Sequence, residues 1–181
     1  GASTFGDNSF IFTNDGDVAV SSFTLSIADG LIQGAVFDPA GTAGDATAKD
    51  FTPGSTGNPN GAAAVLSDAK GNGGFTTLTV TFATPLEAGG ALNFGLDIDP
   101  ISIEGGANDA GSVSGLELSG GTLSVTYEGG ATQTADLFAE GSAGGALAVA
   151  NATSGAPAPS VTLKDIPTAA DPDHPGNLVA N

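Results

Sequence analysis

Asp97 and Asp99 stand two positions apart at the end of an apolar segment. Residues i and i+2 of a strand point to the same side, so we expect both carboxylates on one face, where their charges repel each other unless a cation lies between them. Calcium binds about six to eight oxygen ligands, which carboxylates on loops supply. The spacing therefore predicts a calcium site anchored by Asp97 and Asp99. The alternative is a solvated strand edge whose charges prevent pairing with another sheet.

A second acidic segment runs from Asp38 to Asp50. Its glycines allow tight turns that expose backbone carbonyls. Three carboxylates of this segment could thus converge on a cation: Asp38, Asp45 and Asp50. Lys49 offers the alternative of neutralising them as an ion pair.

Polar residues of other loops extend the candidate site. Two acidic residues that follow Asp99 are further candidate metal ligands, Glu104 and Asp109. Four asparagines are candidates for contacts with a bound ligand: Asn58, Asn60, Asn93 and Asn108. Asn14-Asp15-Gly16-Asp17 spaces its oxygens as calcium loops do, but it lacks the closing Glu of an EF-hand, so we expect a hairpin turn there.

The charge balance restricts the partners of this protein. The 181 residues include 20 Asp and Glu against 3 Lys and no Arg, for a net charge of −17. Such a surface repels phosphate backbones and anionic lipids, so we expect no nucleic acid partner and no membrane insertion. It attracts divalent cations, which again favours Ca²⁺ as the cofactor. Adaptation to high salt is the rival explanation of the acidity.

The composition argues against an enzyme. The one histidine, His174, lies in the C-terminal tail, which leaves no base for a Ser-His-Asp relay, and there is no Cys. A carboxylate pair could hydrolyse a glycosidic bond, but such enzymes need an aromatic-lined cleft, and the chain has no Trp and one Tyr. We expect a binding protein without catalytic residues.

The elements that position these residues are short alternating segments separated by turn residues, and no segment keeps a helical apolar period. We expect an all-β fold, a two-sheet antiparallel β-sandwich of jelly-roll-like type with about ten short strands. The expected strands are 9–14, 18–28, 33–37, 63–66, 75–82, 91–98, 113–118, 122–127, 132–138, 147–150 and 160–163. A change of parity at Ser21-Ser22 indicates a β-bulge.

Two outward rows of hydroxyl residues follow from the alternation: Thr77, Thr79 and Thr81, and then Thr122, Ser124 and Thr126. Flat threonine arrays that order water need many such rows in register. With two short rows in view, we expect ordinary outward strand residues.

The chain divides into three parts. Residues 1–4 are expected to be a cloning remnant, and residues 5–152 the β-sandwich binding domain. Residues 153–181 are a Pro- and Ala-rich C-terminal segment, either packed on the domain or leading to the next module.

Several motifs occur in a familiar order: the FDPAGTAGD loop from Phe37, the DIDP strand end from Asp97, and GSVSGLEL from Gly111. Over roughly residues 5 to 140 the chain resembles ligand-binding β-sandwich modules of large multimodular secreted bacterial proteins, namely RTX-type calcium-dependent adhesins and carbohydrate-binding-like modules. The resemblance implies bound calcium, a secreted or cell-surface location, neighbouring modules in the parent chain, and an extracellular glycan or peptide ligand.

Three functions remain open. The first is calcium-dependent carbohydrate binding without catalysis, the second is capture of a peptide or protein by an adhesin domain, and the third is a structural spacer that calcium makes rigid. Because no aromatic platform is available for stacking on sugar rings, a carbohydrate site would depend on calcium and on Asp and Asn side chains.

Overall fold

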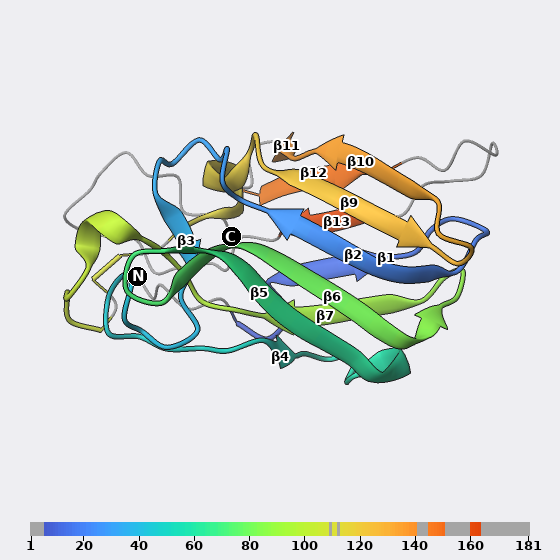
Figure 1. Ribbon diagram of the computed structural model, residues 1–181, viewed down its shortest axis with the longest axis horizontal. Coiled ribbons are helices and arrows are strands. Elements are labelled where there is room, and N and C mark those ends of the chain that lie inside the picture. Colours follow the sequence, from blue (N-terminus) through green and yellow to red (C-terminus); the bar gives the residue numbers. More distant parts are fainter. Residues whose placement is uncertain (1–5, 109, 112, 141–144, 151–159, 164–181) are drawn as a thin grey trace.

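The computed structural model describes residues 6–108, 110–111, 113–140 and 145–150, and the backbone of 160–163. Two antiparallel sheets pack face to face (Figure 1). The described residues contain no α-helix, only three 3-10 turns: η1 (Pro59–Gly61), η2 (Ile101–Ile103) and η3 (Gly115–Leu118). The expectation of an all-β sandwich is confirmed.

The six-stranded sheet lies at the back of Figure 1 and has the order β11-β12-β13-β1-β7-β4. Its strands are β1 (Phe10–Thr13), β4 (Thr52–Pro53), β7 (Ala91–Gly95), β11 (Phe138–Glu140), β12 (Gly145–Val149) and β13 (Ser160–Leu163). The strand β13 has the bounds predicted for residues 160–163, belongs to the C-terminal segment that the sequence set apart from the domain, and pairs with both β1 and β12. The sandwich therefore continues to Leu163.

The seven-stranded sheet lies at the front and has the order β10-β9-β2-β6-β3-β8, with β5 also paired to β6. Its strands are β2 (Val20–Ser26), β3 (Ala35–Phe37), β5 (Ala62–Lys70), β6 (Gly74–Leu86), β8 (Ile98–Pro100), β9 (Thr122–Tyr127) and β10 (Thr132–Asp136). The register of β2 against both neighbours shifts between Val20 and Ser22, which confirms the predicted bulge.

The core lies between the sheets and is built from the alternating apolar residues of both. Phe12 of the back sheet stacks on Phe23 of the front sheet with ring centroids 4.3 Å apart, and Phe10 stacks on Phe94 at 4.7 Å. All four rings are at most 1% exposed. Burial of each such ring stabilises the fold by about 1.5–3 kcal/mol, so the aromatic stack holds the sheets together without any disulfide.

Two predicted strands are wrong in part. Residues 113–118 were expected as a strand, but Gly115–Leu118 form the 3-10 turn η3, because Ser114 and Glu117 make a capping box at its start. Residues 91–98 were expected as one strand, but the chain leaves the back sheet after Gly95 and enters the front sheet at Ile98. That change of sheet positions the acidic residues.

Candidate cation and ligand site

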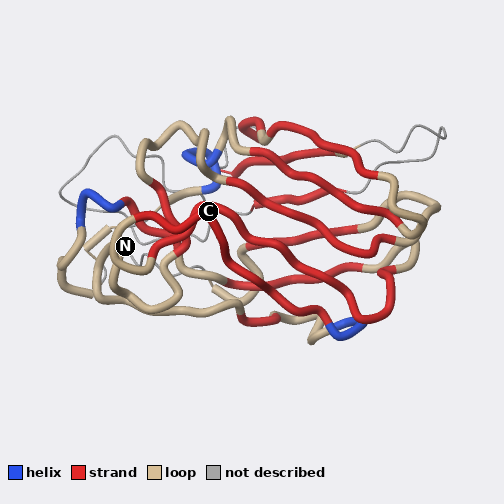
Figure 2. The backbone as a smooth tube through the Cα atoms, viewed as in Figure 1, coloured by secondary structure: helices blue, strands red, loops and turns tan. Residues whose placement is uncertain are grey.

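The chain passes between the sheets at one end of the sandwich, the end where loops gather on the left of Figure 2, and two of these passages carry the acidic segments. Residues 38–51 lead from β3 in the front sheet to β4 in the back sheet, and residues 96–97 lead from β7 in the back sheet to β8 in the front sheet. We call these two segments the paired crossovers. The Asp38 amide donates to the Asp97 carbonyl, and the Asp97 amide to the Lys49 carbonyl, both at 3.0 Å. Both acidic segments found in the sequence thus meet at one place.

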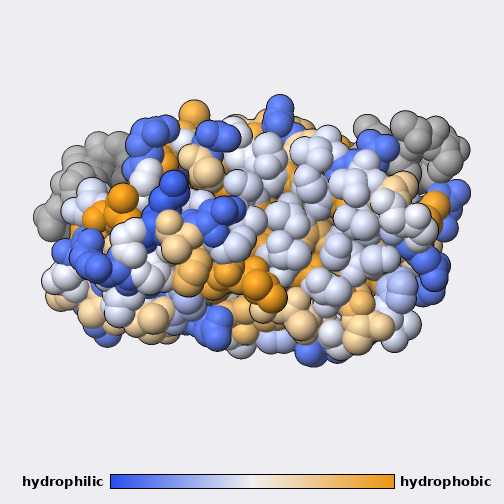
Figure 3. Space-filling model, in the orientation of Figure 1, coloured by the Kyte–Doolittle hydropathy of each residue, from blue (hydrophilic) through white to orange (hydrophobic). Residues whose placement is uncertain are grey.

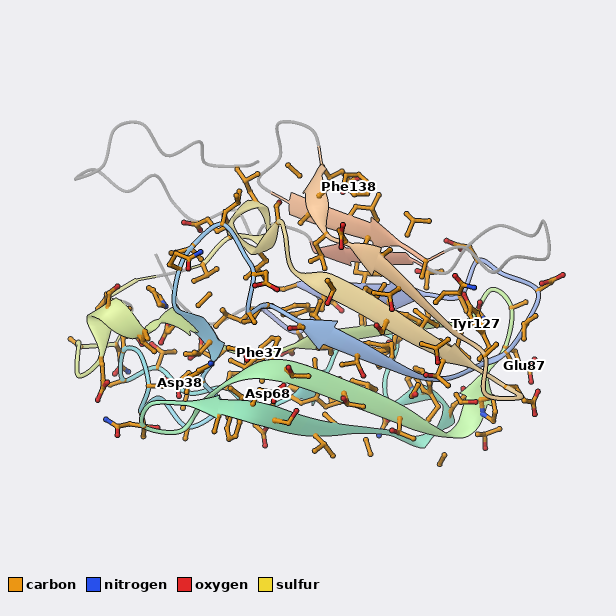
Figure 4. All side chains as sticks on the ribbon, turned by 45° about the horizontal axis from the view of Figure 1, so that its top comes forward. Phe37, Asp38, Asp68, Glu87, Tyr127 and Phe138 are labelled. Atoms are coloured by element: carbon orange, nitrogen blue, oxygen red, sulfur yellow. The ribbon has the colours of Figure 1, made fainter. Side chains whose placement is uncertain are left out.

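Asp38 holds its own loop in shape. Its Oδ1 accepts a hydrogen bond from the amide of Thr42 at 3.0 Å, and its Oδ2 accepts from the amides of Ala43 and Gly44, both at 2.8 Å. The side chain is completely buried, next to Phe37 at the loop end of the sandwich (Figure 4). Three amides directed at one carboxylate make strong, charge-assisted bonds, so Asp38 is primarily an anchor for the backbone of the loop.

Asp45 joins this loop to the loop that follows η2, and Asp99 joins it to β8. The Oδ2 of Asp45 accepts from the amide of Ala110 at 2.8 Å, and the Oδ2 of Asp99 accepts from the amide of Asp45 at 2.9 Å. Gly44 makes the close approach possible, since a Cβ at that position would lie 2.0 Å from the Cβ of Asp99. Only glycine can occupy position 44 at this distance.

Three aspartates of the paired crossovers and one aspartate of the adjoining strand β8 are 0% exposed: Asp38, Asp45 and Asp97, and then Asp99. Both carboxylate oxygens of Asp97 and Oδ1 of Asp99 are shielded from solvent. Ile98, between them, lies in the core, so alternation directs both aspartate side chains away from it. The alternative of a solvated strand edge is therefore wrong, because these carboxylates are enclosed. A buried carboxylate costs several kcal/mol unless it is well bonded or close to a cation.

Two other predicted metal ligands, Asp50 and Glu104, lie apart from this cluster. Asp50 is exposed and accepts a hydrogen bond from the next amide in the chain, that of Phe51, at 2.7 Å. Glu104 is exposed and accepts from the side-chain amide of Asn72. Asp109 lies outside the described residues. Lys49 forms its ion pair with Asp7, so the suggested ion pair of Lys49 with the loop carboxylates is not the one observed.

The carboxylates and backbone carbonyls at the paired crossovers are the oxygen ligands that a hard cation such as Ca²⁺ prefers. Among the residues that the structure describes, however, no group of three or more His, Asp and Glu side chains is arranged so that it could hold a metal ion. The backbone amides of the loops already bond to the oxygens of Asp38 and Asp45. A cation at the paired crossovers would therefore use Asp97, Asp99 and carbonyl oxygens.

The four candidate asparagines do not form one site. Ala62, directly after η1, pairs with Phe82 of β6, whereas Phe37 pairs with Phe75, about seven residues or ~23 Å along the same strand. Asn58 and Asn60 flank or lie within η1, at the far end from the buried aspartates. Asn60 has a structural role, since its side-chain amide donates to the Pro85 carbonyl at 2.7 Å. Asn108 is exposed in the loop after η2.

Asn93 belongs to a polar cluster near the crossovers. Its side-chain amide donates to Oγ of Ser55 at 3.0 Å and to Oδ1 of Asn8 at 3.4 Å, and its backbone amide donates to Oγ1 of Thr56 at 2.8 Å. We call these four residues the Asn93 cluster. Asn93 is half-buried, whereas Asn8, Ser55 and Thr56 are exposed. The cluster presents uncharged amide and hydroxyl groups four residues before Asp97.

A scan against protein-family models and searches of curated proteins and of solved structures each return no match. In the described part of the chain, no helix has the length and apolar character that a bilayer-spanning segment needs.

Sequence reasoning missed the contributions of the backbone. The closeness of Gly44 to Asp99 and the amides of Ala110 and Gly111 at Asp45 depend on how the two loops meet. The only local signal for them was the concentration of glycine in both loops, which favours close backbone contacts without saying between which residues.

Proposed function

We propose that the chain is a non-catalytic, calcium-dependent ligand-binding module of a secreted bacterial surface protein, with carbohydrate as its ligand class. The observation that carries the proposal is the complete burial of Asp97 and Asp99 at the paired crossovers of a chain with net charge −17. A calcium ion coordinated there would offset the repulsion and desolvation of these carboxylates.

In this proposal the ion has a structural role. Because Asp97 and Asp99 are 0% exposed, an ion between them is enclosed by the crossovers and leaves no coordination position to a ligand from solvent. It fixes the end of β7 and thereby the Asn93 cluster, whose amide and hydroxyl groups then contact sugar hydroxyls. Polar groups held in place before binding lose less entropy on binding, which favours affinity.

Thermal unfolding with calcium and with EDTA tests the role of the ion. Calcium at about 100 times its dissociation constant stabilises a protein by ~2.7 kcal/mol, and a domain of this size gains roughly 2–4 °C in melting temperature per kcal/mol. We expect EDTA to lower the melting temperature by about 5–10 °C. The Asp97→Asn variant should lose this response, whereas Asp136→Asn, on the exposed edge strand β10, should keep it.

An unchanged melting temperature in EDTA would disprove the calcium part of the proposal. Stabilisation by sodium chloride alone would assign the acidity to salt adaptation instead. If Asp97→Asn still responds to EDTA like wild type, calcium binds at another place.

A glycan array tests the ligand class. We expect binding that Asn93→Ala abolishes and that Asn58→Ala, the same change at the opposite end of the sandwich, leaves intact. A blank array would exclude carbohydrate. Capture of peptides with a free C-terminal carboxylate, but not of amidated ones, would replace carbohydrate by peptide.

A further inference from the structure

The outer face of the front sheet carries a two-dimensional array of hydroxyl groups. The strands β10, β9, β2 and β6 lie side by side there (Figure 1), and their register aligns outward residues into three cross-strand rows. The rows are Thr132, Thr126, Ser22 and Thr81; then Thr134, Ser124, Thr24 and Thr79; then Asp136, Thr122, Ser26 and Thr77. Every position except Asp136 bears a hydroxyl group. We call these residues the hydroxyl array.

The fold brings further rows of hydroxyl residues into register with the two that the sequence showed. Two rows along strands, in β6 and β9, were visible in the sequence, and the fold inserts β2 between them with Ser22, Thr24 and Ser26 in register. The strand β10 adds Thr132 and Thr134 on the other side of β9. The condition of many hydroxyl rows in register is therefore met.

The array is regular and internally ordered. Neighbouring strands lie about 4.8 Å apart, and alternate residues of one strand about 6.7 Å apart. Thr24 and Thr79 share a hydrogen bond of 3.0 Å between their hydroxyl oxygens, and Ser124 and Thr134 share one of 2.6 Å. The branched threonine side chains have few rotamers, so these hydroxyl and methyl groups keep fixed positions.

The array is almost uncharged on a strongly acidic protein. The net charge is −17, yet the only charged member of the array is Asp136, at its corner on the edge strand. Figure 3 shows pale colouring over the middle of this face, with the strongly hydrophilic colour concentrated toward the ends of the molecule. On the far side of β6, β5 extends the rows with Ala63, Val65 and Ser67, of which Val65 is 64% exposed.

We infer that the hydroxyl array binds the surface of crystalline ice. The prism faces of hexagonal ice repeat their water oxygens at spacings close to those of this array. A hydroxyl group both donates and accepts hydrogen bonds, as each water of the lattice does, while the threonine methyl groups and Val65 exclude disordered water. Charged groups, which hold their own hydration shells, are confined to the edge of the array: Asp136 at one corner, and Asp68 of β5, whose exposed carboxylate accepts a hydrogen bond from the Thr77 hydroxyl.

Ice fits this face better than a polysaccharide does. Sugar rings stack on exposed aromatic side chains, and no residue of the array is aromatic. The exposed Phe138, at 52%, lies on β11 in the other sheet. Because sheets twist, the match to a planar lattice is best at the central strands. Substitutions at Thr24 and Thr79 should therefore reduce ice binding most.

Partitioning into slowly growing ice, in buffer that contains calcium, tests the inference. We expect the wild-type protein to enter the ice and Thr24→Lys to be excluded, because its long charged side chain stands in the middle of the array. Thr13→Lys adds the same charge to the outer side of β1 in the other sheet and should enter the ice like wild type. Thr24→Ser keeps the hydroxyl group and should retain most of the ice-bound fraction.

Melting temperatures of all variants establish that they are folded. Exclusion of the wild-type protein from ice would overturn the inference. Equal partitioning of Thr24→Lys and wild type into ice would also overturn it. The same would follow if Thr13→Lys lost as much of the ice-bound fraction as Thr24→Lys. Retention of the wild-type protein on insoluble cellulose, lost in Thr24→Lys and without entry into ice, would assign the array to a polysaccharide instead. None of these results depends on the Asn93 cluster, so the proposed carbohydrate site is tested separately.

Discussion

Replacement of Asp38 by alanine measures how strongly the buried carboxylates hold the loop end of the sandwich. The change removes the acceptor of three backbone amides, two of them in hydrogen bonds that are fully buried. An unsatisfied buried donor costs about 1–3 kcal/mol. With partial relaxation of the loop, we expect a loss of about 3–5 kcal/mol in the free energy of unfolding, similar to the loss when a buried charged group loses its partner.

The assay is thermal unfolding followed by circular dichroism. At roughly 2–4 °C per kcal/mol for a domain of this size, the melting temperature should fall by about 6–20 °C. Asp50→Ala is the matched control, because Asp50 is exposed and, among the described residues, its side chain accepts a hydrogen bond from the adjacent amide of Phe51 alone. This control should change stability by no more than about 0.5 kcal/mol.

The same comparison in EDTA separates two roles of Asp38. If its carboxylate acts on the loop amides, the difference from wild type persists without calcium. A difference that disappears in EDTA would make Asp38 a metal ligand. A melting temperature equal to that of wild type in both buffers would refute the role of this carboxylate as an anchor.

Two further predictions concern the same fold. Gly44→Ala should destabilise the protein by about 1–3 kcal/mol in chemical denaturation, because the new Cβ would overlap Asp99. The cost should exceed that of Gly89→Ala, where nothing lies within 4 Å and the positive φ of 76° adds only ~1 kcal/mol; the reverse order would contradict the close packing. Burial raises the pKa of the Tyr127 phenol above its ordinary value of 10.0. The contribution of the neutral Tyr127 phenol to the free energy of unfolding should therefore be fully present below about pH 10 and fall as the pH rises through the raised pKa. Since Tyr127 is the one tyrosine and the chain lacks Trp, its ultraviolet absorbance titrates this group alone, and a midpoint at or below 10.0 would be the contrary result.

Strong local alternation made much of the fold predictable. Residues 122–127 alternate hydroxyl and apolar side chains, and β9 has the predicted bounds. The bulge in β2 was likewise visible, since two consecutive serines shift the parity of the apolar residues. These features depend on neighbours in sequence, and the period of a strand encodes them directly.

Features that depend on contacts distant in sequence were not predictable. The two-residue strand β4 exists because Thr52 and Pro53 lie beside β7, and nothing local marks it. The sequence placed Asp97 and Asp99 at a strand end, but their burial results from the loop of Asp38 and Asp45, which lies more than fifty residues earlier in the chain. The hydroxyl array is similar, because its rows come from strands whose order in the sheet differs from their order in the chain.

The placement of β13 beside β1 decides how this domain responds to mechanical force. The two strands are antiparallel neighbours, and Phe10 at the start of β1 is opposite Leu163 at the end of β13. Tension applied through flanking modules would therefore pull both strands from the same end and break their ladder bonds one after another. Parallel loading of all the bonds, which makes a domain resist extension, does not occur in this geometry. In a chain under tension, this sandwich would unfold at low force and lengthen the chain.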